Sequence, residues 1–241
     1  MTLSAKYNMI YPPLVARIIV EESGKKDPLK AAKTRMHQLY GAYLNGNAHK
    51  KASVLLNEMK TEEILLLHAS TKERLPYHNE FYNFITETTE TVQTVLDLGC
   101  GFHPFGVPFA PQAYHAYDID LRTQALLNRF FTSLGLPAVA KCADLITETP
   151  AETVDLAFML KLIPVLNAQA PERGYALANA LYAKFIVISY PAKSLGGHEK
   201  GMGKNYTASF KNAVSNGLLN NFSLLAHKRI GNELIYIIAR V

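Results

Sequence analysis

The sequence predicts an α/β protein, in which a seven-stranded, mostly parallel sheet follows a helical N-terminal segment. Residues 1–75 place apolar side chains at three- and four-residue spacing, whereas from residue 92 short β-rich segments alternate with amphipathic helices. The chain ends in two strands joined by a turn, which is typical of a doubly wound sheet finished by an antiparallel hairpin. We therefore expect two domains, 1–75 and 76–241.

The N-terminal helices follow from prolines, glycines and capping residues. Prolines favour the first turn of a helix, so Pro12 and Pro28 each open one. Asn47 and Thr61 are expected to cap the next two helices. Residues 70–73, Ser-Thr-Lys-Glu, have the form of a capping box, and Pro76 re-aims the helix that they start. The helices are expected at 12–23, 28–44, 48–60, 61–69 and 78–89.

The sheet domain is predicted from β-branched runs and intervening amphipathic segments. A helix over 121–135 is closed by a glycine, and a second helix spans 171–183. Gly231-Asn232 provides the turn of the final hairpin. The strands are expected at 92–99, 114–120, 138–145, 154–161 and 184–191, with two more within 221–241.

The positive charge of the chain is concentrated at its beginning. The net charge is +5, and residues 1–75 hold 12 Lys/Arg against 7 Asp/Glu, whereas 76–241 hold 13 of each sign. A basic module on a neutral body indicates a polyanionic partner, although a solvated surface with a slight lysine excess is the plainer alternative.

Several classes of protein are excluded by composition. A membrane span needs about 20 apolar residues, and no segment comes near that length. No secretory signal is visible at the N-terminus. Two cysteines, Cys100 and Cys142, cannot build a disulfide scaffold or a zinc site alone. We expect a cytoplasmic protein without a metal, and a monomer, because nothing in the sequence indicates an obligate dimer.

Acidic residues and glycines mark the ends of three successive predicted strands. The turn Asp97-Leu98-Gly99-Cys100-Gly101 lets the backbone approach a ligand closely. Asp118, about 20 residues further on, suits the two ribose hydroxyls of a nucleoside. Asp144 can accept from an exocyclic amine while Leu145 packs on an adenine face. This arrangement resembles Rossmann-like class I S-adenosylmethionine (SAM)-dependent methyltransferases.

Three longer segments carry a closer resemblance. These are HASTKERLP (68–76), VLDLGCGFHPFG (95–106) and SYPAKSLGGHEKGMGKNYTASF (189–210). They are similar to the aminoglycoside-resistance 16S rRNA (guanine-N7) methyltransferases, and the likeness covers most of the chain. The resemblance implies transfer of a methyl group from SAM, with S-adenosylhomocysteine as product, to N7 of guanine 1405 in the decoding site of the 30S subunit, and aminoglycoside resistance as the consequence.

The resemblance also implies a set of cofactor-binding residues. Arg74 would bind the carboxylate of the methionine moiety in bidentate fashion, since a guanidinium matches that geometry. Without the resemblance, a surface ion pair would be the plainer role for it. The expected cofactor contacts are His68, Ala69, Ser70, Arg74, Asp97, Gly99, Gly101, Asp118, Ile119, Asp144, Leu145, Leu160 and Gln169.

A second set would contact the RNA. In the loop after the fifth strand, Lys193, His198, Lys200 and Met202 are expected to position the target base, with histidine at 198 where the family pattern has arginine. Phosphate contacts position RNA without reading its sequence. The expected phosphate contacts are Lys25, Lys26, Lys30, Lys33, Lys50, Lys51, Lys193, Lys200 and Lys204.

Guanine N7 carries a free lone pair, so its attack on a sulfonium methyl requires no general base. The sequence thus predicts alignment and base presentation without a catalytic acid/base pair. Two alternatives remain open. One is methylation of N1 of a nearby decoding-site adenine, for which Phe105, Tyr190 and Tyr206 could form an aromatic sandwich. The other is a non-catalytic protein that binds SAM and rRNA.

Overall fold

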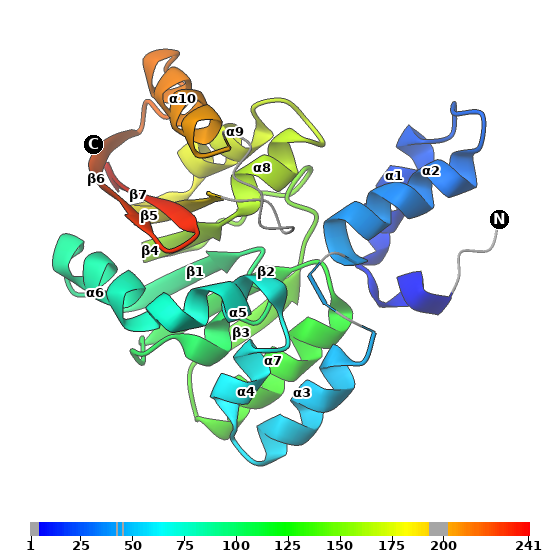
Figure 1. Ribbon diagram of the computed structural model, residues 1–241, viewed down its shortest axis with the longest axis horizontal. Helices are drawn as coiled ribbons and strands as arrows, with labels where there is room; N and C mark the ends of the chain where they lie inside the picture. The colour runs from blue at the N-terminus through cyan, green and yellow to red at the C-terminus, as the bar shows by residue number, and fades with distance from the viewer. Residues whose placement is uncertain (1–4, 42, 45, 193–201) are drawn as a thin grey trace.

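Seven strands form one sheet in the order β3-β2-β1-β4-β5-β7-β6 (Figure 1). The computed structural model describes residues 5–41, 43–44, 46–192 and 202–241. The predicted seven-stranded, mostly parallel α/β sheet is confirmed. Its strands are β1 Thr94–Leu98, β2 Ala113–Asp118, β3 Ala138–Cys142, β4 Thr153–Leu160, β5 Tyr182–Pro191, β6 Phe222–Ile230 and β7 Glu233–Arg240.

The sheet has a switch point at its centre. From β1 the chain moves outward through β2 to β3, and then returns to β4 on the other side of β1. The β1–β2, β2–β3, β1–β4 and β4–β5 pairs are parallel, whereas β7 is antiparallel to both β5 and β6. Ligands of open α/β sheets bind outside the carboxyl ends of the strands at such a point, so β1 and β4 place the site.

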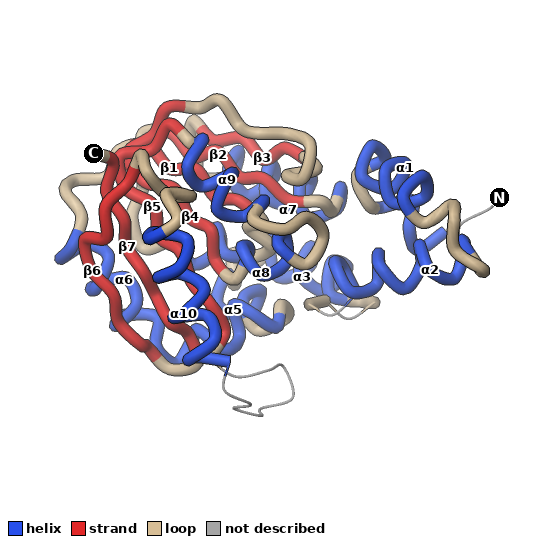
Figure 2. Tube along the Cα trace, turned by 90° about the horizontal axis from the view of Figure 1, so that it is seen from above, coloured by secondary structure: helices blue, strands red, loops and turns tan. Residues whose placement is uncertain are grey.

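Helices cover both faces of the sheet (Figures 1 and 2). Alternate strand residues enter two separate apolar clusters, for example Val95 and Leu96 of β1, or Val187 and Ile188 of β5. One face packs against α3 Ala48–Asn57, α4 Thr61–Leu65, α6 His78–Thr88 and α7 Leu121–Ser133, with the short α5 Ala69–Arg74 beside them. The other face packs against α8 Leu162–Asn167, α9 Arg173–Ala180 and α10 Met202–Ser215.

The first two helices form a separate unit. Helices α1 Pro12–Glu21 and α2 Pro28–Met36, here called the N-terminal hairpin, extend away from the sheet (Figure 2). Their apolar side chains form a third cluster, with Ile18 and Met36 fully buried. The backbone of Tyr11 donates to Ile119 O (2.8 Å), and Ile119 packs against this cluster. The hairpin therefore meets the sheet near the carboxyl end of β2.

Helices α3 and α4 are different, because they belong to the sheet body. Ala52, Leu56 and Ile64 are buried in the same cluster as Val95 of β1. The residues before 76 thus fall into two parts, a hairpin with its own core and helices that share the core of the sheet. No helix within the described ranges combines the length and the apolar character needed to cross a membrane.

Some local expectations were wrong. Ser70 lies inside α5 and His68 precedes it, so the capping box does not form; instead Thr71 Oγ1 donates to Leu65 O (2.5 Å). Lys60, not Thr61, precedes α4, and the Asn47 side chain makes no capping hydrogen bond. Helices α8 and α10 were not predicted. Helix α8 has six residues and contains a proline, so packing against the sheet rather than periodicity specifies it.

Candidate cofactor site

A cavity opens at the carboxyl ends of β1, β2 and β4, where the topology places a ligand site. Leu14, Leu39 and Tyr40 of the N-terminal segment form part of its wall. Of the residues expected to bind the cofactor, Ala69 is not among those that line the cavity; its backbone donates to Tyr43 O (3.0 Å). The expected residues that do line it are His68, Ser70, Arg74, Asp97, Gly99, Gly101, Asp118, Ile119, Asp144, Leu145, Leu160 and Gln169.

The glycine turn after β1 forms the floor of the cavity. Gly99 has φ +63° and Gly101 φ +51°, a left-handed conformation that other residues adopt at a cost. A Cβ on Gly101 would come within 2.7 Å of His68 Nε2, and one on Gly99 within 3.0 Å of Leu162. Both positions therefore require glycine, for backbone conformation and for space.

Asp118 is held in place by the same turn. Its Oδ2 accepts from Gly101 N (2.8 Å), and its Oδ1 accepts from Ile119 N (2.7 Å) and Asp120 N (3.0 Å). Burial raises the pKa of Asp118, while these three backbone donors act in the opposite direction. A carboxylate has about four acceptor sites, so one remains for a ribose hydroxyl.

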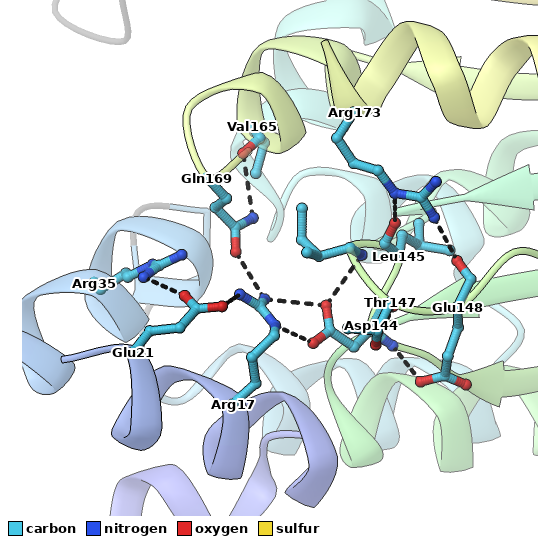
Figure 3. Close-up of polar contacts among 11 residues, drawn as sticks. Arg17, Glu21, Arg35, Asp144, Leu145, Thr147, Glu148, Val165, Gln169 and Arg173 are labelled. Carbon is cyan, nitrogen blue, oxygen red and sulfur yellow. Dashed lines mark hydrogen bonds and ion pairs between the residues drawn. The ribbon is translucent and has the colours of Figure 1, made fainter. Parts of the chain in front are cut away.

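Asp144 lies two residues after β3, and its carboxylate is bound by Arg17 of α1, which is not among the described residues that line the cavity (Figure 3). Arg17 Nε donates to Asp144 Oδ2 (2.5 Å), and Arg17 Nη2 donates to Asp144 Oδ1 (3.1 Å) and to Gln169 Oε1 (3.0 Å). Ile146 N also donates to Asp144 Oδ1 (3.2 Å). Leu145, beside Asp144, and Leu166 provide apolar surface at this end of the cavity. Carboxylate and apolar surface together suit an adenine ring.

The opposite end of the cavity is rich in charge. Arg74 Nη2 donates to Glu233 Oε2 (2.9 Å), and Lys161 Nζ lies 2.6 Å from Glu73 Oε2 and 3.6 Å from Glu233 Oε1. Burial raises the pKa of Glu233, but Arg74 and Lys161 outweigh burial and hold it below its ordinary value. Sequence reasoning missed Lys161 and Glu233. The only signal was their place at the end of β4 and the start of β7.

Among the described residues, three buried polar atoms near this end have no hydrogen-bond partner: His68 Nδ1 and Arg74 Nε, whose residues line the cavity, and Glu233 Oε1, which lies 3.6 Å from Lys161 Nζ. Buried polar groups are normally paired, so unpaired donors and acceptors beside a cavity suit a ligand with complementary groups. The methionine moiety of SAM carries a carboxylate and an ammonium. The chain thus offers charged groups for methionine, Asp118 for ribose, and Asp144 with Leu145 for adenine, and the residues fit this cofactor.

Asp97 also has a structural role. Its Oδ2 accepts from Tyr114 Oη (2.7 Å) and lies 2.8 Å from His103 Nδ1, and His103 Nε2 lies 2.7 Å from Tyr82 Oη. All four side chains are buried. This network fixes the strand end from beneath the cavity, so Asp97 serves the packing of the turn as well as lining the site.

The residues expected to meet the RNA are only partly described. Lys193, His198 and Lys200 lie outside the described residues, and Met202 begins α10, with its side chain also outside them. Lys33 is half-buried. The remaining lysines expected to contact phosphate are exposed, namely Lys25, Lys26, Lys30, Lys50, Lys51 and Lys204.

The fold and the cavity together define a class of protein. A sheet of this order, a glycine turn after β1, acids at the ends of β2 and β3 and a charged methionine end are the features of a Rossmann-like, SAM-dependent methyltransferase. The chain is an enzyme of this class, and SAM is its cofactor.

Comparison with known proteins identifies the family. Residues 3–237 match the family described as "Ribosomal RNA methyltransferase (FmrO)". A 16S rRNA (guanine(1405)-N(7))-methyltransferase of Serratia marcescens is 35% identical over 98% of this chain and 94% of its own length. One of Micromonospora rosea is 30% identical over 98% and 93%. The crystal structure of the 16S rRNA methyltransferase RmtF with S-adenosyl-L-homocysteine has a TM-score of 0.89 and 32% identity, covering 99% of this chain and 95% of that one. The chain belongs to the FmrO family of ribosomal RNA methyltransferases.

Proposed function

We propose that the protein transfers a methyl group from SAM to N7 of guanine 1405 in the 16S rRNA of the 30S subunit. The observation that carries the proposal is the family membership over residues 3–237 combined with a cavity that fits SAM. Aminoglycoside resistance is the consequence that the resemblance to resistance methyltransferases implies. The site of action is then the cytoplasm, where 30S subunits are found.

The proposed reaction requires the protein to align the methyl donor with guanine N7, and it requires no proton transfer. SAM, when bound, supplies an electrophilic methyl group on a sulfonium. Guanine N7 has its lone pair free, so the protein needs to hold donor and acceptor in line and exclude water. His68, one of two histidines among the described residues that line the cavity, has a pKa lowered to about 3, mainly by burial and then by Arg74 and Lys161. It is neutral at working pH and supplies no proton.

A basic groove next to the cavity suits the RNA backbone. It lies between the N-terminal hairpin and α8, and its lining includes four cations, Lys25, Lys26, Lys30 and Arg35, against two acids, Glu22 and Asp27. The groove and the cavity share Leu39, Val165 and Gln169. RNA phosphates bound along the groove would bring a base that has left the stack close to the cofactor.

In this proposal the two predicted domains have different roles. We assign rRNA docking to residues 1–75 and catalysis to 76–241, with His68, Ser70 and Arg74 reaching the cavity from the end of the first domain. Lys193, His198, Lys200 and Met202 remain the proposed base-positioning residues, and Lys33, Lys50, Lys51 and Lys204 remain proposed phosphate contacts. We also propose that the protein acts as a monomer.

The positions of Phe105, Tyr190 and Tyr206 do not favour methylation of adenine N1. Tyr190 is buried against Tyr206, with ring centroids 5.1 Å apart, in the cluster on one face of the sheet. Phe105 is buried in the cluster on the other face. These three rings cannot sandwich one flipped base.

Transfer of labelled methyl from SAM to purified 30S subunits tests the proposal, with Asp118→Ala as the cofactor-site control. Borohydride reduction followed by aniline cleaves RNA at 7-methylguanine, and we expect one scission, at nucleotide 1405. Scission elsewhere, or methylation without scission, would contradict the guanine N7 assignment. Wild-type protein that binds SAM and leaves 30S unlabelled would contradict catalysis on this substrate.

A further inference from the structure

Arg17 connects two parts of the molecule that the sequence separates by 127 residues. It lies on α1 of the N-terminal hairpin, and its guanidinium donates hydrogen bonds to both carboxylate oxygens of Asp144 and to the amide oxygen of Gln169 (Figure 3). The Asp144 side chain is 2% exposed and that of Arg17 12%. The pair is thus shielded from water, where a bidentate contact is stronger than a surface ion pair.

Further ion pairs connect Arg17 to the second helix of the hairpin, α2. Arg17 Nη1 donates to Glu21 Oε1 (2.9 Å), and Arg35 Nη1 of α2 lies 2.6 Å from Glu21 Oε2 and 2.9 Å from Glu22 Oε1. A chain of ion pairs therefore runs from α2 through α1 to the end of β3.

The opposite side of Asp144 is fixed by the sheet body. Arg173 of α9 donates from Nε to Leu145 O (2.8 Å) and from Nη2 to Glu148 O (3.0 Å) (Figure 3). The backbone after β3 is therefore held independently of the hairpin. What the hairpin adds is control of the Asp144 carboxylate itself.

Arg17 holds the carboxylate without filling the cavity. Asp144 and Gln169 line the cavity, and Arg17 is not among the described residues that line it. Two donors of Arg17 and the backbone of Ile146 use three of about four acceptor sites on Asp144. One acceptor site is left for the exocyclic amine of adenine. Gln169 Nε2 donates to Val165 O (3.2 Å), so its amide is also oriented.

We propose that Arg17 is a positioning residue that couples the seating of the N-terminal hairpin to recognition of the adenine ring. The inference rests on SAM binding at this cavity, and its link to the ribosome rests on the function proposed above. With the hairpin seated, Asp144 presents a fixed acceptor to adenine. Because the basic groove is built on the same hairpin, RNA binding and cofactor binding stabilise the same arrangement, and each raises the affinity for the other.

Calorimetry with S-adenosylhomocysteine tests the cofactor half of the proposal without any RNA. Loss of hydrogen bonds to a buried charged group lowers affinity by about tenfold or more, and we expect Arg17→Gln to do so. Arg17→Lys should restore little, since an ammonium is a point charge that cannot reproduce the bidentate fork. Arg129→Gln is the matched control, because Arg129 bonds to Ser53 and Asn57 of α3 and is not among the described residues that line the cavity.

Two readouts separate positioning from general destabilisation. S-inosylhomocysteine carries an acceptor oxygen where adenine has the amine, so the wild type should strongly prefer the adenosyl compound and Arg17→Gln should reduce that preference. In a double-mutant cycle with Asp144→Asn, the effects on affinity should be strongly non-additive. An unchanged preference, additive effects, or tighter binding by Arg17→Gln would overturn the proposal; tighter binding would make Arg17 a competitor of adenine.

The proposed coupling between cofactor binding and ribosome binding is tested with 30S subunits. S-adenosylhomocysteine should raise the affinity of the wild type for 30S, and Arg17→Gln should abolish that increase while Arg129→Gln retains it. An increase retained by Arg17→Gln would contradict the coupling. If the wild type binds S-adenosylhomocysteine but not 30S, the proposed function fails, and the calorimetric tests of Arg17 still decide the adenine contact.

Discussion

Gly101 lies directly against the imidazole of His68. A Cβ at Gly101 would be 2.7 Å from His68 Nε2, and the histidine ring also lies between Tyr43 and Phe102, with centroids 5.9 and 5.7 Å away. The glycine turn after β1 and the segment HASTKER (68–74) thus pack together, although 33 residues separate Gly101 from His68. Their contact joins the helical N-terminal part to the cofactor site.

Gly101→Ala should damage this contact more than it damages the backbone alone. The substitution forces a left-handed residue and a clash with His68, so we expect a loss of about 2 kcal/mol or more in the free energy of unfolding. Gly135→Ala is the matched control, because Gly135 has φ +61° and no described residue places an atom within 4 Å of its Cβ position. Denaturant unfolding of both variants checks this. Equal losses would mean that His68 moves aside freely.

Stability should fall in mild acid because of His68. The pKa of His68 is about 3 in the folded protein and 6.5 in the unfolded chain. Between these pH values the unfolded chain therefore binds a proton that the native protein does not. Stability therefore decreases as the pH falls below 6.5. From pH 7 to pH 5 the contribution is about 2 kcal/mol. His68→Gln should show a shallower pH dependence in denaturant titrations; an unchanged slope would contradict the assignment.

Removal of Glu233 should destabilise the fold. Glu233→Ala leaves the buried Arg74 without its carboxylate partner and Lys161 with Glu73 alone, and breaking such a buried pair costs about 3 kcal/mol or more. Glu80→Ala is the control, since the Glu80–Lys228 pair is half-exposed and contributes at most about 1 kcal/mol. Urea unfolding of the two variants should give clearly different midpoints. Similar midpoints would show that the cations find other partners.

Charge reversal at the groove should weaken ribosome binding selectively. Lys25→Glu with Lys26→Glu should lower affinity for 30S and reduce the slope of log K against log salt by roughly 1 to 2. Affinity for S-adenosylhomocysteine should stay the same. Lys184→Glu is the control, because that exposed residue lies at the start of β5 and pairs with Glu90. Filter binding across a salt series provides the test. Equal effects of both changes would argue for non-specific attraction.

The rate of methyl transfer should be nearly independent of pH between 6 and 8. Guanine N7 needs no base, and His68 does not titrate there because its pKa is about 3. Single-turnover rates with saturating SAM and 30S measure this. A steep rise that follows one side chain, with both affinities unchanged, would require a general base.

The sequence predicted the sheet well because its signals are local. β-branched runs, glycines and the 3.6-residue period specify each strand and long helix within a short window. Asp97, Gly99, Asp118 and Asp144 could be placed at one site because the carboxyl ends of parallel strands meet at one edge. The short helix α8 escaped prediction, since its core contacts rather than its own pattern stabilise it.

By itself the sequence determined the fold class, the basic N-terminal segment and the acids that mark the cofactor cavity. Only the tertiary structure decided which charges meet there. Arg17 with Asp144, and Arg74 with Glu233, are joined across 127 and 159 residues. Such pairs carry no local signal, because an arginine on a helix surface has the same pattern whether it faces water or a distant carboxylate. Chain topology brings them together, and burial then makes the contacts strong.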